Sequence, residues 1–258
     1  MFRKAALGLM TGMALAVSGL ATPVSAQQGL SPEQRTAVEA LIKEVLLKNP
    51  EIIQEALVEL ERRQQQAQVD SQKQILVTEK AAIFDAPKSA IAGNAQGDVT
   101  LVEFFDYNCG FCKRSLTDLQ ELIKQDPKLK VVLKDFPVLG ADSVEASRVA
   151  IAVKNQLKAD KYFAFHVALM STRGRINGAK ALEVAKDFGV NLEMAKRDMD
   201  STETRTTIED TVVLGDRLGL TGTPAFIIAD EIVFGAVGVD QIKSRIDAVR
   251  KCGKTNCG

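Results

Sequence analysis

The 258-residue sequence contains one histidine, His166, and no tryptophan, and its 33 basic and 33 acidic side chains give no net charge. A single imidazole argues against a histidine-rich metal centre and against Ser-His-Asp catalysis. Proteins that hold nucleic acid carry a basic excess, so the balanced charge argues against a nucleic-acid partner. Hydrophobic residues make up 46% of the chain, which is enough for a packed core. The four cysteines remain as the candidates for chemistry.

The amino terminus has the pattern of a secretory signal peptide. Arg3 and Lys4 precede an uncharged stretch that ends near Pro23, and three small residues follow at 24–26. A membrane anchor is the alternative, but the stretch is interrupted and falls short of the roughly 20 apolar residues that span a bilayer. We therefore expect residues 1–26 to be a signal peptide for export to the periplasm, where disulfides persist. No cysteine follows the expected cleavage site, which argues against a lipid anchor.

Residues 27–84 are expected to be a helical segment. Ser31, Pro32 and Gln34 have the spacing of an N-cap, a proline at the first helical position and a capping box. Asn49-Pro50 predicts a break between two helices. An apolar stripe follows both helices and then fades into a glutamine-rich stretch; its members are Val38, Leu41, Ile42, Val45, Leu46, Ile53, Leu57 and Leu60.

A thin stripe on a lone helix of about 30 residues, about 45 Å long, cannot bury itself. The segment is therefore expected to be a stalk between two bodies or one strand of a homo-oligomeric bundle. A solvated helix lying on its own globular domain is the alternative.

Residues 85–258 have the pattern of one α/β domain. Turn-forming residues at 85–87 and 92–98 mark its beginning. A buried strand, a helix and a second strand then form the strand-helix-strand unit of a parallel sheet. A helical insertion at about 141–218 precedes two strands and a closing helix. The predicted strands and helices outside the insertion are 99–105, 113–124, 130–136, 225–229, 231–237 and 240–250.

Cys109 and Cys112 are the strongest candidates for chemistry. They form a Cys-Gly-Phe-Cys string where the predicted strand 99–105 turns into a helix. At a helix N-terminus, free backbone N–H groups and the helix dipole favour an anion and so lower the pKa of the first thiol. Cys112, one turn further along, is placed to close a disulfide with Cys109 and release a mixed disulfide. The pattern predicts a redox-active dithiol.

Other uses of the cysteines stay open on the sequence alone. A structural Cys109–Cys112 disulfide would close a very short loop, which stabilises little. A zinc site could combine this pair with Cys252 and Cys257, and soft thiolates could also bind Cu(I). Cys252 and Cys257 lie in a polar carboxyl-terminal tail. A local disulfide is the simplest expectation there, and a second redox centre is the alternative.

The predicted strand, the CGFC string and Thr223-Pro224 together resemble the thioredoxin-fold superfamily. The helical insertion narrows the resemblance to the DsbA-like branch of periplasmic thiol-disulfide oxidoreductases. The resemblance implies an α/β thioredoxin fold with an inserted helical domain, here preceded by the helical stalk or oligomerisation segment. It also implies that Pro224 is cis and faces the dithiol, and that the backbone of Thr223 pairs with a substrate strand. An ordinary turn proline is the alternative.

DsbA-like proteins also carry a buried acid and a lysine near the buried sulfur. Glu103, six residues before Cys109, and Lys134, on the next predicted strand, match these places. The resemblance implies that they transfer a proton to or from Cys112. A simple ion pair at the edge of a strand is the alternative.

The sequence departs from the best-known DsbA pattern in two places. Gly110 and Phe111 stand where that pattern has a histidine, and Thr223 before the proline is more typical of disulfide-isomerase members. By resemblance, the pKa of Cys109 is expected to be less depressed and the couple less oxidising. The helical segment 27–84 is similar to the oligomerising segments of isomerase-type and copper-resistance-type relatives, some dimeric and some trimeric.

These features predict an exported thiol-disulfide oxidoreductase that exchanges disulfides with client proteins, favours isomerisation or reduction, and uses no cofactor. A membrane redox partner and a homo-oligomer, dimer or trimer, belong to the same expectation. A DsbA-type dithiol oxidase is the alternative with the same chemistry. A periplasmic copper- or zinc-binding or chaperone-like protein is the alternative from another class.

Overall fold

The computed structural model describes residues 30–85 and 87–258, so the expected signal peptide (1–26) lies outside the described residues. The chain divides into two units, Met1–Glu61 and Arg62–Gly258. Among the described residues, no helix combines the length and the hydropathy that crossing a membrane requires.

The first unit contains α1 (Pro32–Lys48) and the beginning of α2 (Glu51–Thr78), separated at Asn49-Pro50 as the sequence predicts. The expected capping box is present: Ser31 Oγ accepts from the Gln34 N–H at 3.2 Å, and Gln34 Oε1 accepts from the Ser31 N–H at 2.9 Å. No residue of α1 is buried, and the apolar stripe lies open, with Leu41 59% and Leu57 55% exposed. Nothing in the described part of the chain covers this stripe.

The second unit is built on a five-stranded sheet with the order β1-β3-β2-β4-β5. The central strands β2 and β3 are parallel, whereas β1, β4 and β5 pair antiparallel with their neighbours. Of the four strands that the sequence predicts, β2 has the predicted bounds and the others shift by one to three residues. The strands are β1 (Ala90–Gly93), β2 (Val99–Phe105), β3 (Leu129–Asp135), β4 (Ala225–Ile228) and β5 (Glu231–Phe234).

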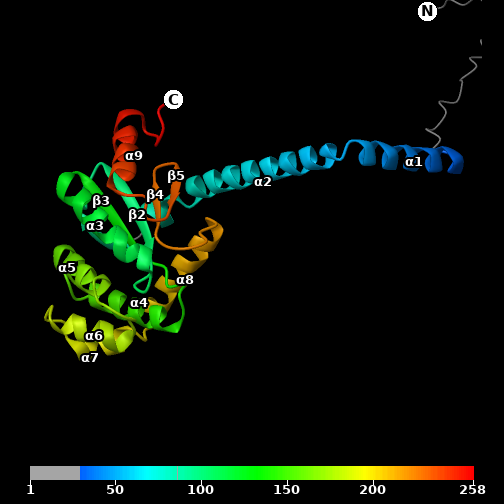
Figure 1. The fold of residues 1–258 in the computed structure, drawn as a ribbon. Coiled ribbons are helices and arrows are strands. Elements are labelled where there is room, and N and C mark those ends of the chain that lie inside the picture. Colours follow the sequence, from blue (N-terminus) through cyan, green and yellow to red (C-terminus); the bar gives the residue numbers. More distant parts are fainter. Residues whose placement is uncertain (1–29, 86) are drawn as a thin grey trace, which may run out of the picture. The chain divides into compact units, whose positions relative to one another are not determined.

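Helices cover both faces of this sheet (Figure 1). One face packs against α3 (Gly110–Gln125), α9 (Val239–Cys252) and α5 (Ala159–Met170) of the helical insertion. The other face packs against α8 (Thr202–Arg217), the end of α2 and the π-helical turn Ala81–Asp85. The insertion also contains α4 (Ala141–Lys154), α6 (Gly178–Lys186) and α7 (Leu192–Asp198).

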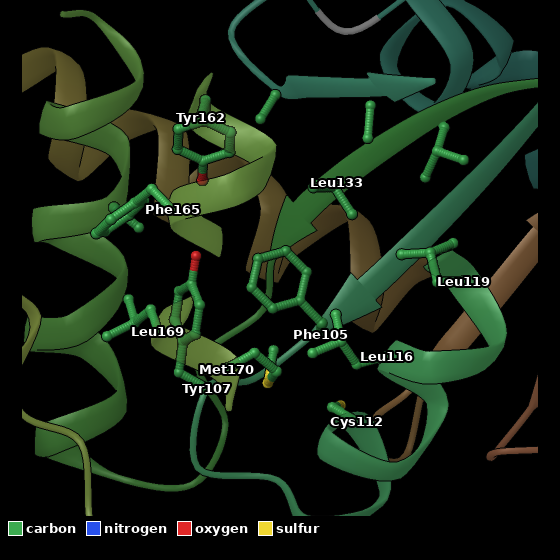
Figure 2. Packing of buried hydrophobic residues seen from close by; sticks show 14 of the residues in the cluster. Phe105, Tyr107, Cys112, Leu116, Leu119, Leu133, Tyr162, Phe165, Leu169 and Met170 are labelled. Atoms are coloured by element: carbon green, nitrogen blue, oxygen red, sulfur yellow. The ribbon is translucent and has the colours of Figure 1, made fainter. Parts of the chain in front are cut away.

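The alternation of side chains along the strands divides the core in two. On β2, Leu101 and Phe105 enter the core beneath α3, whereas Val102 and Phe104 enter the core beneath α8. Figure 2 shows the first core, in which Phe105 lies between α3 residues and residues of α5. A side chain on β2 or β3 therefore belongs to the α3 face or to the α8 face according to its position in the strand.

The second unit begins at Arg62, whereas the sequence pattern predicts the domain boundary at residue 85. Leu76 on α2 and Ile83 in the π-helical turn are buried in the core beneath α8. Gln72 Nε2 also donates to the Leu218 carbonyl at 3.1 Å. The second half of α2 is therefore part of this unit.

The short strand β1 was not expected from the sequence, because its small residues run into a cluster that was interpreted as turns. It pairs antiparallel with β3, with Ala90 opposite Leu133 and Gly93 opposite Lys130. Strand formation here depends on pairing with β3, since alanine and glycine have low strand propensity of their own.

Candidate active site

Cys109 lies at the junction of the sheet and α3. The strand β2 ends at Phe105, and after a short turn Cys109 is the N-cap residue of α3. Its Sγ accepts a hydrogen bond from the backbone N–H of Cys112 at 3.4 Å. Both thiols are free, and both residues are buried, Cys109 at 6% and Cys112 at 1% exposure. The spacing of the pair therefore places the first sulfur at a helix N-terminus, where the sequence predicted it.

The Thr223-Pro224 segment faces the first sulfur. The peptide bond between these residues is cis, as the resemblance implied. Cys109 Sγ lies 3.1 Å from the Thr223 carbonyl oxygen, to which the thiol donates while it carries its proton. The sheet brings the two segments together, because β4 begins at Ala225, directly after Pro224, and pairs with β2.

The two thiols have opposite pKa shifts. Hydrogen bonding from the Cys112 thiol lowers the pKa of Cys109 to about 5, with further lowering from the Thr223 side chain and the backbone N–H groups of Cys112 and Phe111, against the opposing effect of burial. Burial raises the pKa of Cys112 far above its ordinary value, and its hydrogen bond to Cys109 and the nearby Glu103 raise it further. Cys109 is therefore a thiolate at neutral pH, while Cys112 keeps its proton.

A polar network that the sequence interpretation missed fixes the turn before Cys109. The carboxylate of Asp106 accepts from the Asn108 N–H at 2.8 Å, from Ser143 Oγ at 2.7 Å and from the Leu139 N–H at 3.0 Å. The side-chain amide of Asn108 donates from Nδ2 to the Ile176 carbonyl and accepts at Oδ1 from the Ile176 N–H, each at 2.8 Å. These bonds tie the active-site turn to the helical insertion.

The only sequence signal for this network was the pair of small polar residues directly after a buried strand. Asp106 and Asn108 flank Tyr107 there, and such residues hydrogen-bond readily to a nearby backbone. Their partners in the insertion lie more than 30 residues away in sequence, at separations of 37 for Ser143 and 68 for Ile176. No local pattern identifies contacts of that range.

Glu103 lies on the same sheet face as Cys112 and α3. It is 3% exposed, and burial raises its pKa to about 8, with a hydrogen bond to Ser115 acting in the opposite direction. Its charge is one of the causes of the raised pKa of Cys112. Glu103 is therefore an acid that keeps its proton near neutral pH, close to the buried sulfur.

Lys134 does not join this group, so its expected place near the buried sulfur of Cys112 is wrong, and the alternative of an ion pair with Glu103 is wrong as well. In the parallel register of β2 and β3, Glu103 lies opposite Leu133, and Lys134 lies opposite Phe104. Residues in register share a face and adjacent residues point to opposite faces, so Lys134 is on the α8 face of the sheet. Its Nζ donates to Ser89 Oγ at 3.3 Å.

His166 belongs to the core of the insertion. It is 1% exposed, its ring stacks on Phe163 with centroids 6.1 Å apart, and its Nδ1 lies 3.1 Å from the Tyr107 hydroxyl. Burial lowers the pKa of His166 to about 3, so the ring is neutral, and its Nδ1 shares one hydrogen bond with the Tyr107 hydroxyl.

The carboxyl-terminal cysteines pair with each other. Cys252, the last residue of α9, forms a disulfide with Cys257, with Cα atoms 5.9 Å apart. This bond removes two ligands from the four-cysteine zinc site considered above. Across residues 30–85 and 87–258, no group of three or more His, Cys, Asp or Glu side chains could hold a metal ion. The two free thiols of the described residues are Cys109 and Cys112, and burial keeps the second one protonated, so this pair does not fit a thiolate metal site.

The sheet order, the N-cap thiol and the cis-proline segment define a thioredoxin-fold protein with a dithiol centre. A family model described as DSBA-like thioredoxin domain matches residues 100–247, more than half of the chain. The chain belongs to this family, whose members are thiol-disulfide oxidoreductases. A second family model, described as the N-terminal domain of the copper resistance protein ScsC, matches residues 34–67.

Solved structures give the same picture. A thioredoxin-like oxidoreductase from Silicibacter pomeroyi DSS-3 is 38% identical, with 67% of this chain and 98% of that chain covered and a TM-score of 0.63. The thiol-disulfide exchange protein alpha-DsbA2 from Wolbachia pipientis is 30% identical, with 71% of this chain and 98% of that chain covered and a TM-score of 0.65. A linker-deletion variant of Proteus mirabilis ScsC is 27% identical, with 88% of this chain and 99% of that chain covered and a TM-score of 0.65.

Two curated relatives are named as Na(+)/H(+) antiporters. NhaA 1 of Salinispora arenicola is 20% identical and NhaA 3 of Salinispora tropica is 18% identical. Each match covers 63% of this chain but only 25% of the antiporter. The antiport activity is therefore attributed only to those longer proteins.

The hydrogen bond from Cys112 to the Cys109 sulfur yields a test with two matched variants. Cys112→Ser keeps a hydroxyl donor, whereas Cys112→Ala removes it. We expect the pH midpoint for iodoacetamide alkylation of reduced Cys109 to lie near 5 in the unchanged chain, to stay low in Cys112→Ser, and to rise in Cys112→Ala. Equal midpoints in the two variants, or a wild-type midpoint near that of free cysteine, about 8.5, would contradict the assigned cause.

Burial of Glu103 predicts a pH-dependent cost to stability. From its ordinary pKa of 4.5 up to about 8, the unfolded chain loses this proton while the folded chain keeps it, so stability falls as the pH rises through that window. Glu103→Gln removes the titrating group. Urea unfolding should show the variant close to wild type at pH 4 and more stable by about 2–4 kcal/mol at pH 8.

Glu121→Gln, an exposed change on α3, is the matched control and should leave the pH profile of wild type unchanged. A Glu103→Gln profile parallel to that of wild type between pH 4 and pH 8 would mean that Glu103 is not a buried acid with a raised pKa.

Proposed function

We propose that the protein is an exported thiol-disulfide oxidoreductase that exchanges disulfides with client proteins and favours isomerisation and reduction over the insertion of new disulfides. The pair of thiols with opposite pKa shifts is the observation that carries the proposal. Disulfide exchange requires a nucleophile that attacks the client disulfide and a second thiol that resolves the mixed disulfide. The ionised sulfur of Cys109 and the protonated sulfur of Cys112 supply these two roles.

The reaction begins at the Cys109 thiolate. It attacks one sulfur of a client disulfide, the client S–S bond breaks, and a client thiolate leaves as a mixed disulfide with Cys109 forms. For isomerisation, the freed client thiolate attacks elsewhere in the client, and a client thiolate finally displaces Cys109 unchanged. For reduction, Cys112 loses its proton and attacks the Cys109 sulfur, which releases the second client thiolate. The client then gains two electrons and the protein holds a Cys109–Cys112 disulfide.

Proton transfer is the part of this reaction that we assign to Glu103. Cys112 attacks only as a thiolate, yet its surroundings strongly favour the thiol. Glu103 is close to it and has a pKa of about 8, so the protonated form dominates at neutral pH and a minor fraction of Glu103 is ionised. Its carboxylate accepts the Cys112 proton as the resolving attack begins.

Client binding is assigned to the surface around Cys109. The backbone of Thr223 lies within hydrogen-bond distance of the sulfur and pairs with an extended client segment. Phe111, Val138 and Leu139 are 56%, 45% and 46% exposed and offer apolar contacts to an unfolded client. The Arg114 guanidinium lies 4.2 Å from the centroid of the Phe111 ring and supports it from one side.

The intermediate activation of Cys109 supports the proposed preference for isomerisation. Gly110 and Phe111 add no cation beside the sulfur, and its pKa of about 5 lies between those of thioredoxin, about 7, and of DsbA, about 3.5. A thiolate of intermediate stability favours neither the oxidised nor the reduced centre strongly. Such a centre attacks wrong disulfides and is released again without leaving a trapped product.

Location and assembly are part of the proposal. The pattern of residues 1–26 supports export to the periplasm, where a membrane redox partner would keep the centre in its working redox state. The open apolar stripe of α1 and α2 supports a homo-oligomer, dimer or trimer, in which copies of the chain pack these helices together.

Catalysis at the dithiol is tested by insulin reduction and by ribonuclease refolding. Cys109→Ala should lower insulin reduction to background, whereas the double variant Cys252→Ala/Cys257→Ala should keep wild-type activity, because that disulfide lies outside the centre. Wild-type protein should reactivate scrambled ribonuclease faster than it oxidises reduced ribonuclease. Insulin reduction that survives in Cys109→Ala would exclude this centre, and faster oxidation than reactivation would identify a dithiol oxidase.

The apolar stripe is tested by charge substitutions that leave the dithiol domain untouched. Leu41→Lys/Leu57→Lys places two charges on the stripe, and Ala40→Lys adds a charge on the opposite side of α1. Light scattering after size exclusion should give a multiple of the chain mass for wild type and Ala40→Lys, and the mass of one chain for the double variant. A single-chain mass for wild type would contradict the oligomer.

A further inference from the structure

A pocket of about 400 Å³ lies on the α8 face of the sheet, which is the face opposite the dithiol centre. It is bounded by Lys134 on β3, by the segment Pro87–Ser89, by Glu79 and Ala82, and by one side of α8. Its size is typical of sites for small organic molecules. The strand register separates it from Cys109, because Lys134 and Glu103 point to opposite faces of the sheet.

The inner end of the pocket carries a buried ammonium group. Lys134 is 5% exposed, and its Nζ donates to Ser89 Oγ at 3.3 Å. The ammonium group of Lys134 has three N–H groups, and among the described residues Ser89 Oγ is the one acceptor for them. No carboxylate of the described residues lies within 4.0 Å of the Nζ. A buried cation without a counter-ion is costly, and burial lowers its pKa to about 8. Such a group is rare in proteins unless it has a partner.

The charges at the rim do not supply that partner. Asp210 lies 3.8 Å from the Lys88 ammonium, and Glu79 lies 2.6 Å from the Arg217 guanidinium. Asp210 attracts Lys134 only from a greater distance and is 73% exposed. Each rim carboxylate therefore has a rim cation, and the charge of Lys134 is left over.

The lining of the pocket combines apolar and polar side chains. Ala82, Pro87, Val213 and Leu214 supply the apolar part, and Thr207 and Thr211 also line the pocket. A bare inorganic anion would leave the apolar side chains without contacts, whereas a chain or ring attached to one carboxylate would cover them while the carboxylate reached the ammonium group.

We propose that this pocket binds a small organic carboxylate with an apolar body, and that Lys134 Nζ anchors its carboxylate at the inner end. The second carboxylate oxygen accepts from Ser89 Oγ when that hydroxyl turns its hydrogen toward the ligand. The site takes no part in disulfide exchange, since it lies on the other face of the sheet.

Octanoate is the probe for this site, and the absence of tryptophan from the chain provides the reporter. Val213 lines the pocket and is 51% exposed, so Val213→Trp in the full chain introduces a single indole at the rim. Octanoate should change its fluorescence saturably. Adding Lys134→Met should weaken binding at least tenfold, while Lys134→Arg, which keeps the charge, should restore most of it.

Lys130→Met is the matched control. Lys130 lies on the same strand and the same sheet face, and its Nζ donates to the Phe84 carbonyl at 3.2 Å, outside the pocket. Binding in this variant should stay within twofold of the Val213→Trp parent. Equal binding by Lys134→Met and the parent, or an equal loss in Lys130→Met, would overturn the proposal.

A second measurement uses the unchanged chain and does not depend on whether any variant folds. Calorimetry should detect octanoate and should find 1-octanol, which has the same apolar length without the charge, at least tenfold weaker. Equal affinity for the two would show an apolar groove without an anion anchor, and no heat from octanoate would show no carboxylate site. Either result would overturn the proposal.

Discussion

The hydrogen bonds that favour a negative charge on Cys109 are the interaction on which the proposed chemistry depends. They come from a thiol one turn along α3, from the first backbone N–H groups of that helix and from the Thr223 side chain. Each donor is placed by a different part of the fold: the helix start by β2, and Thr223 by the pairing of β4 with β2. The network of Asp106 and Asn108 then ties the turn to the insertion. The sheet and the insertion thus stabilise one charge.

The same sheet keeps two ionisable groups apart. Glu103 and Lys134 are both buried in strands, and a pair of this kind would normally be expected to neutralise each other. The register places them on opposite faces, so each has its own surroundings and its own shifted pKa, both near 8. The acid is left free to exchange a proton with the buried thiol, and the lysine is left to a separate pocket. One strand register thus produces two chemically independent sites.

Features that depend on local sequence could be predicted, and features that depend on distant contacts could not. The capping box at Ser31, the break at Pro50, the bounds of β2 and the N-cap position of Cys109 all follow from residues a few positions apart. The face of Lys134 does not, because Val131, Val132 and Leu133 before it are apolar on both sides and give no alternation. The partners of Asn108, the strand β1 and the packing of Leu76 each need a segment far away in the chain.

The reduction potential of the Cys109–Cys112 couple tests the central claim most directly, because a stabilised thiolate favours the reduced form and raises the potential. Equilibration with glutathione at pH 7 and counting of free thiols would measure it. We expect a value between that of thioredoxin, about −270 mV, and that of DsbA, about −120 mV. A potential at or below the thioredoxin value would contradict this expectation, because it would mean that the charge on Cys109 is not stabilised.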